Sequence, residues 1–549
     1  MNCIGCLIFL RHIGADTIME EQSKAKGSVG SVYLISALIL GLFVLWGVLN
    51  PQSLGNLANQ ALGYIINSFG WFYMSVTLFF VAFIVYLAIG PYGKLKLGKS
   101  DEIPAYSFYA WVGMLFSAGI GVGFVFWGVA EPVLYYIDSP IGVTQETEEA
   151  AIAGLRYAVY HWAFHPWAIF SLTGLAIAFA QYRSGQPALV SSAFYPLLGE
   201  QTKGWGGKSI DILAIIATAT GVATTFGLSA MQISGGISHL TSIPNTTITQ
   251  LIIIGIVTVL FLFSAASGLD KGIKILSVIN MTIAGLLLII VMLMGPTLFI
   301  LENIVTTIGG YLTQFVSMSL TMTPFSESSW LGNNTIFFWA WHISWAPFMG
   351  LFIARISKGR TIREFVTGVL IVPSVLAAIW FSAFGGTALY MERILGIDIS
   401  SSVFASVELA LFTVLSELPF SSVLSFVAVL LILIFFVTSA DSATYVLGVL
   451  ASNGNLNPKM STRLIWGVLL AATASVLLIS GGLKGLQTAS IVAALPFSFI
   501  MLGMVFSLLK LLKNEYKIEL EEKEEGLRTQ LKEQIREEMM ESKEKKQVV

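Results

Sequence analysis

Aromatic side chains gather in two short, apolar stretches of the chain. The first contains Trp162, Trp167 and Phe170, and the second contains Trp341 and Trp345. An aromatic face attracts a cation that has no N–H group to donate, and each desolvated face contributes about 0.5–2 kcal/mol. Several such faces together would bind a small cation with micromolar to millimolar affinity. Ordinary packing of bulky side chains is the alternative interpretation.

Glycines alternate with other residues in a third stretch, which runs from Ser117 to Gly123 and also contains Gly119 and Gly121. A glycine in a helix interior costs about 1 kcal/mol relative to alanine. Inside a membrane this cost is acceptable where the backbone lies against a ligand or an ion. Close helix packing through small residues is the alternative. A dinucleotide-binding loop is disfavoured because the spacing differs and no strand precedes it.

Adjacent hydroxyl side chains, Thr438 and Ser439, lie deep in another apolar stretch. Sodium takes oxygen ligands, which hydroxyls and unwound backbone carbonyls supply in membrane transporters. Alternatively, each hydroxyl bonds only a carbonyl of the preceding helical turn.

The composition indicates which type of secondary structure positions these residues. Of the 549 residues, 55% are hydrophobic and 11% are charged, against roughly 25% charged in a soluble domain. The apolar residues form blocks of about 20, the length of a helix that crosses about 30 Å of hydrocarbon. We therefore predict an all-α polytopic membrane protein rather than a β-barrel, which would show alternating strands of about 10 residues. The net charge of −2 gives no indication of a nucleic-acid partner.

The apolar blocks predict twelve transmembrane spans, over residues 31–50, 70–90, 106–130, 156–181, 209–235, 247–267, 274–300, 334–357, 364–388, 421–451, 461–481 and 486–512. Lys and Arg concentrate in alternate loops, as expected because they mark the cytoplasmic side. Only Arg393 and Lys484 depart from this alternation. Both termini are therefore predicted to be cytoplasmic.

Several segments lie outside these spans. We expect an amphipathic surface helix over 302–322, a short helix over 403–416 and a charged helix over 513–549. The last is either a solvated tail or a regulatory one. Cys3 and Cys6 lack the further ligands or the fold context of a zinc or redox site. The first 18 residues are either an atypical signal segment or precede a true start at Met19.

Over about residues 31–512 the sequence resembles the betaine/carnitine/choline transporters. The motifs that carry the resemblance are Ala118–Gly123 with Ala130-Glu131-Pro132, the run from His161 to Trp167, Trp341-His342-Ile-Ser-Trp345, and Ala354–Glu364. The resemblance implies two inverted five-helix repeats, spans 3–7 in residues 106–300 and spans 8–12 in 334–512. Residues 1–30 would form a cytoplasmic tail, 31–105 two peripheral helices, and 301–333 the surface helix and its loop. The third and eighth spans would be broken and hold the substrate at the midplane.

Carried over by position, the resemblance assigns the substrate box to Trp162, Trp167, Trp341 and Trp345, with Gly119, Gly121 and Gly123 beside it. Phe170 replaces a frequent Tyr and keeps the aromatic face. His342 replaces a usual Trp, which leaves the substrate open. It would either form a hydrogen bond to a carboxylate or to a less methylated solute such as ectoine, or lie outside the substrate's contact shell.

The resemblance also implies ion sites. One sodium would bind the backbone oxygens of Ser117, Ile120 and Phe435 with the hydroxyls of Thr438 and Ser439. A second would bind Thr218 opposite Phe348, although Val222 lacks the hydroxyl found there in some members. Residues 209–235 contain no Lys or Arg, and Gly123 supplies no carboxylate, so sodium symport is favoured over exchange or proton coupling.

These observations predict a plasma-membrane importer of a quaternary-ammonium osmolyte, with sodium as coupling ion and no organic cofactor. Glycine betaine is the leading substrate, followed by choline or carnitine and then ectoine or a sulfonium analogue. A membrane enzyme is disfavoured because no nucleophile is paired with a base. A channel is disfavoured because channels assemble few spans per chain around a shared pore. Family members are often trimers, so a homotrimer is a further expectation.

Overall fold

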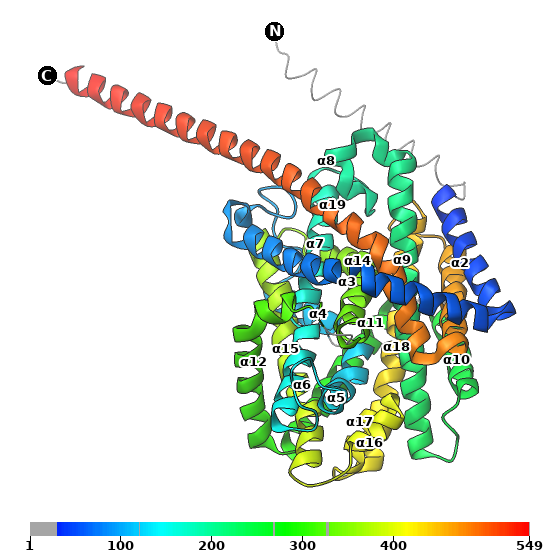
Figure 1. The fold of residues 1–549 in the computed structure, drawn as a ribbon. Helices are drawn as coiled ribbons and strands as arrows, with labels where there is room; N and C mark the ends of the chain where they lie inside the picture. Colours follow the sequence, from blue (N-terminus) through cyan, green and yellow to red (C-terminus); the bar gives the residue numbers. More distant parts are fainter. Residues whose placement is uncertain (1–29, 120, 267–269, 326–328, 548–549) are drawn as a thin grey trace.

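The computed structural model of the chain describes residues 30–119, 121–266, 270–325 and 329–547. Regular structure in these residues is helical, apart from one antiparallel bridge between Lys96 and Thr361. The long helices form one bundle, and the C-terminal helix projects from it (Figure 1). The predictions for Cys3, Cys6, Met19 and the 1–29 tail lie outside the described residues.

The first two helices differ from the predicted spans at one boundary. Helix α2 covers Ser31–Leu49 and α3 covers Pro51–Ile89. The helix that contains the second predicted span, 70–90, therefore begins at Pro51, well before the predicted start. The cause is local, because the Asn50 side chain accepts from the Ser53 backbone N–H at 2.9 Å and Pro51 occupies the first helical position.

The third predicted span is interrupted, as expected. Helix α4 covers Phe108–Gly119, and α5 covers Val122–Ile137. Gly121 has extended backbone (φ −140°, ψ −174°) and precedes the first turn of α5, which has no side-chain cap.

The fourth predicted span, 156–181, is not one helix. It consists of α6 (Glu148–Trp162) and α7 (Phe164–Ala178), followed by a π-helical turn over Phe179–Arg183. Ala163, at φ −96° and ψ −125°, separates the two helices. The prediction overlooked Pro166, which has no N–H to continue the helical hydrogen bonds across this point.

The eighth span was expected to be broken, and this expectation is wrong. A short helix, α13 (Trp330–Asn333), precedes α14, which is continuous over Thr335–Ile356 and contains Pro347. The one glycine in α14 is Gly350, so this helix lacks the alternating glycines that make extended backbone inexpensive between α4 and α5.

The remaining helices follow the predicted blocks. The long ones are α9 (Trp205–Leu240), α10 (Thr247–Ala266), α11 (Asp270–Met294), α12 (Thr297–Leu320), α15 (Ile362–Arg393), α18 (Ser421–Ala451) and α19 (Met460–Gln547). Helix α12 corresponds to the expected amphipathic helix, and the short α16 (Ser400–Ala405) and α17 (Ala410–Ser416) correspond to the segment 403–416. Short helical turns, including α8 (Tyr195–Leu198), connect residues 191 to 203.

Ten helices of the described chain are long and apolar enough to cross a membrane. Helix α19 bends at Gly482 (φ 56°, ψ −136°) and joins the predicted eleventh span, the twelfth span and the charged tail. Helices α4 and α5 are each too short to count separately. The chain is therefore an all-helical multi-pass membrane protein, while the count of twelve and the inverted repeats remain predictions.

Helices α5, α7 and α14 form the centre of the bundle. Nearly every side chain of α5 and α7 is buried, and α14 packs against α7, α9 and α19. A helix that is apolar on all sides is a buried one. The predicted glycine and tryptophan stretches therefore lie inside the protein rather than in an interfacial belt.

Candidate solute-binding site

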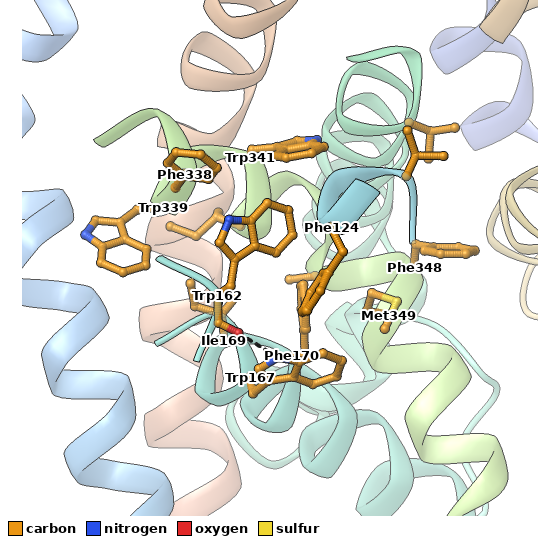
Figure 2. Close-up of a cluster of buried hydrophobic side chains, with 14 of the residues drawn as sticks. Phe124, Trp162, Trp167, Ile169, Phe170, Phe338, Trp339, Trp341, Phe348 and Met349 are labelled. Carbon is orange, nitrogen blue, oxygen red and sulfur yellow. Dashed lines mark hydrogen bonds between the residues drawn. The ribbon is translucent and has the colours of Figure 1, made fainter. Parts of the chain in front are cut away.

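A cavity of about 220 Å³ lies where these central helices meet α9, α11 and α18. Its lining consists of Gly121, Val122, Gly123, Phe124, Trp162, Pro166, Trp167, Phe170, Thr225, Ser277, Asn280, Trp341, His342, Trp345, Phe348, Met349, Phe352, Phe435, Thr438, Ser439 and Ser442. Segments more than 300 residues apart in the sequence thus share one small enclosure. Figure 2 shows part of this lining, with Phe124, Trp162, Trp167, Phe170, Trp341 and Phe348 labelled.

Most of the residues predicted from the sequence line this cavity. All six predicted box side chains are present, as are Gly121, Gly123, Phe348, Phe435, Thr438 and Ser439. Thr218 is fully buried in α9 but does not line the cavity. For Ser117 and Gly119 only the helical backbone is described, and Ile120 lies outside the described residues.

Gly123 allows two of the tryptophans to reach the cavity. A Cβ atom at this position would lie 2.3 Å from Cη2 of Trp162 and 3.1 Å from Cη2 of Trp341. The two indole rings contact each other edge to face, with centroids 5.7 Å apart. The glycine is therefore required by the approach of the rings, whereas a Cβ at Gly121 would meet no atom within 4 Å.

A buried carboxylate holds Trp162 in place. The Trp162 indole N–H donates to Oε2 of Glu131 at 2.9 Å, and Nδ1 of His161 lies 2.5 Å from Oε1 of the same carboxyl group. Nε2 of His161 lies 3.0 Å from the hydroxyl of Thr335 at the start of α14. Glu131 and His161 are completely buried. This network joins α5, α6 and α14 and orients one wall of the cavity.

Trp167 is positioned by the break between α6 and α7. The carbonyl of Trp162 has no helical partner, because the residue four positions on is Pro166. The indole N–H of Trp167 donates to this carbonyl at 3.2 Å, as the dashed line in Figure 2 shows. The Trp167 ring also contacts Phe170, with centroids 5.4 Å apart. One proline thus links the two tryptophans of this stretch.

His342 lies within the aromatic cluster and lines the cavity. Its ring centroid is 5.2 Å from that of Trp162 and 5.8 Å from that of Phe170. Its Nδ1 lies 2.6 Å from the carbonyl oxygen of Phe338, so Nδ1 carries a hydrogen and donates. A neutral ring then has a lone pair on Nε2.

Hydroxyl and amide groups form the less aromatic part of the lining. The Thr438 hydroxyl donates to the carbonyls of Ile434 and Phe435, which is the alternative interpretation of a bond to the preceding helical turn. Its oxygen lone pairs are still available to accept or to bind an ion. Thr225, Ser277, Asn280 and Ser442 are lining residues that sequence reasoning missed. For Asn280 a signal was present, since it is the one amide in the predicted span 274–300 and polar residues are costly inside a membrane.

The uncapped start of α5 adds a positive pole. Gly121 contributes no side chain to cap the helix, and the N–H groups of Val122 and Gly123 are the first two of α5. The first N–H groups of a helix have no intrahelical partner and favour an anion such as a carboxylate. The cavity therefore combines aromatic faces suited to a cation with backbone donors suited to an anion.

The chain is similar to known proteins over most of its length. A family model described as the betaine/carnitine/choline family transporter matches residues 31–517. The chain belongs to this family of membrane transporters for compatible solutes, and it is not an enzyme.

Several relatives match over most of their length. The chain is 48% identical to the "Glycine betaine transporter OpuD" of Bacillus subtilis, over 89% of this chain and 95% of the relative. It is 43% identical to the "Ectoine/hydroxyectoine transporter" of Virgibacillus pantothenticus, over 89% and 97%. It is 40% identical to "Glycine betaine transporter 1" of Vibrio parahaemolyticus, over 88% and 94%.

The close approach at Gly123 generates a prediction. Gly123→Ala should raise the KM for the transported solute about tenfold or more, because overpacking of about 1–3 kcal/mol displaces the Trp162 ring. Initial uptake rates over a range of solute concentrations measure this effect. Gly113→Ala in α4, where a Cβ meets no atom within 4 Å, is the matched control and should keep the original KM. Equal KM values for both variants would contradict the steric role of Gly123.

Proposed function

We propose that the protein imports glycine betaine by sodium symport with alternating access. The observation that carries this proposal is the composition of the cavity lining. Aromatic faces surround a space that also receives the uncapped N-terminus of α5. A trimethylammonium group matches the aromatic faces, because it is a cation without N–H donors. A carboxylate on the same molecule matches the helix terminus.

Sodium coupling is supported by the shared lining. Phe435, Thr438 and Ser439 of α18 line the same cavity as the aromatic residues. The α4–α5 interruption also reaches the cavity lining, at Gly121. An ion there would favour the α5–α18 arrangement that also binds the solute, which is the physical basis of coupling between two ligands.

A second sodium site would involve Thr218 and Phe348. The Thr218 hydroxyl is buried and has no hydrogen-bond partner among the described residues. A bound cation would use this oxygen. Val222, one turn further on, adds no hydroxyl, so the proposal rests on the first site and treats the second as an addition.

The topology belongs to the same proposal. The alternation of Lys and Arg between loops supports a plasma-membrane protein with both termini in the cytoplasm. Helix α12, with several exposed apolar side chains such as Leu298, Val305 and Val316, supplies a surface for a homotrimer contact.

Ectoine is the second candidate substrate, because of His342. The Nε2 lone pair of a neutral His342 ring would accept a hydrogen bond. Ectoine has N–H groups to donate, whereas betaine has none. The ectoine/hydroxyectoine transporter at 43% identity is consistent with this candidate.

The first test is uptake of labelled glycine betaine by cells that lack their own osmolyte carriers. We expect saturable uptake with sodium outside and little uptake when potassium replaces it. Cells with an empty vector are the control. Uptake that is independent of sodium would refute the symport, and absence of uptake alongside ectoine transport would select the second candidate.

Variants of the hydroxyl pair test the ion site. Thr438→Ala and Ser439→Ala should each raise the sodium concentration for half-maximal uptake about tenfold, because each removes one oxygen ligand. The solute KM at saturating sodium should change much less. The comparison is Thr444→Ala on the same helix, whose hydroxyl donates to the Asp441 carbonyl and does not line the cavity. An unchanged sodium dependence in the first two variants would show that sodium does not bind at Thr438 and Ser439.

Replacement of His342 tests solute choice. His342→Phe retains a ring and removes both nitrogens, so it should lower ectoine uptake relative to betaine uptake by about fivefold or more, corresponding to about 1 kcal/mol for one hydrogen bond. Competition between the two labelled solutes measures this ratio. His239→Phe, an exposed position at the end of α9, is the control. A constant ratio would show that the imidazole does not select the solute.

A further inference from the structure

Helix α11 presents one buried stripe to the bundle and apolar side chains to its surroundings. The exposed positions include Ile275, Val278 and Ile279, and later Leu286, Ile289 and Leu293. Asn280 begins the buried stripe, which continues through Ala284, Leu287 and Val291 at helical spacing. An amide thus occupies a position where the rest of the stripe is apolar.

The Asn280 amide is buried and unpaired. The residue is 1% exposed and lines the cavity together with Ser277. Neither Nδ2 nor Oδ1 has a hydrogen-bond partner among the described residues. By contrast, Asn303 of α12 donates from Nδ2 to the Phe299 carbonyl at 2.8 Å. Because an unpaired buried amide is unfavourable, its presence at the cavity wall indicates a partner that the protein itself does not supply.

Most other N–H donors of the cavity lining already have acceptors within the protein, so few donors remain for a ligand. The indole N–H groups of Trp162, Trp167 and Trp341 donate to Glu131 and to the carbonyls of Trp162 and Gly221, respectively. The Nδ1–H of His342 donates to the Phe338 carbonyl. The aromatic wall therefore has its N–H groups engaged within the protein, with the exception of Trp345 Nε1.

A carboxylate in the cavity needs more donors than the α5 terminus supplies. A carboxylate has about four acceptor positions, whereas Val122 and Gly123 contribute one backbone N–H each. The buried side-chain N–H groups of the lining without a partner in the described chain are the two hydrogens on Asn280 Nδ2 and the indole N–H of Trp345, so Asn280 supplies two of these three donors. An uncharged donor is also suitable, because it leaves the cationic end of a zwitterion unaffected.

We infer that Asn280 is a substrate-contacting residue that donates to the carboxylate of the solute and thereby selects zwitterions over simple cations. This inference rests on the proposed function. It assigns the selection between betaine and choline to α11, outside the aromatic cluster. Choline carries the same trimethylammonium group without a carboxylate, so the aromatic faces alone do not distinguish the two.

Asn280→Asp tests the inference, because it keeps the side-chain shape and replaces the donor by a negative charge. We expect the KM for betaine to rise at least about tenfold, because two carboxylates repel each other, while choline uptake increases relative to the original protein. Asn280→Ala should weaken betaine uptake without a gain for choline. Asn303→Asp is the matched control and should keep the original ratio of the two solutes. The amount of each variant in the membrane is measured in parallel.

The outcomes separate the alternatives. If Asn280→Asp and Asn280→Ala lower betaine and choline uptake by the same factor, the amide binds a water molecule or has only a packing role. The inference is then overturned. If Asn280→Asp does not reach the membrane, the betaine-to-choline ratio of Asn280→Ala decides, and an unchanged ratio overturns the inference. If the original protein carries ectoine but not betaine, the proposed function fails separately, and the same ratio is measured with ectoine, which also bears a carboxylate.

Discussion

The interruption between α4 and α5 is the constraint on which the rest of the site depends. A helix that stops inside the bundle leaves backbone N–H groups without partners, and a membrane offers no water to satisfy them. The protein tolerates this at Gly121 because the adjacent cavity receives these groups. Two residues later, the absence of a side chain at Gly123 allows Trp162 and Trp341 to approach the same point. One short glycine stretch therefore accounts for both the free backbone donors and the close approach of two aromatic rings at the cavity.

A buried hydrogen-bond network fixes the side chains around this interruption. Glu131 binds Trp162 and His161, and His161 lies within hydrogen-bond distance of Thr335, so three helices share one buried polar network. Such a network specifies a single arrangement because each unsatisfied member would be costly in a medium of low dielectric constant. The indole of Trp167 likewise restores the hydrogen bond that Pro166 removes. The aromatic rings are thus fixed before a solute binds, which lowers the entropic cost of binding.

The cavity also brings together two kinds of lining group, aromatic and polar, from distant parts of the chain. Most of the aromatic faces come from α6, α7 and α14, and the hydroxyl and amide groups come from α9, α11 and α18. A solute and an ion that contact both groups would stabilise the same relative position of these helices. In the proposed alternating-access mechanism these helices would move relative to each other, and ligands that bind across the junction would control that movement.

Sequence alone determined the class of the protein, because hydrocarbon thickness and the scarcity of charge permit only long apolar helices. It also identified the glycine stretch and the tryptophans, whose types are unusual at such positions. The continuous α14 was decided by the local backbone, which has no glycine run to lower the cost of a break. Tertiary structure alone decided that His342 joins the cluster and that Asn280 faces the cavity unpaired. Both depend on which neighbours a side chain meets after packing, and that information is contained in contacts between distant segments rather than in the spacing along one helix.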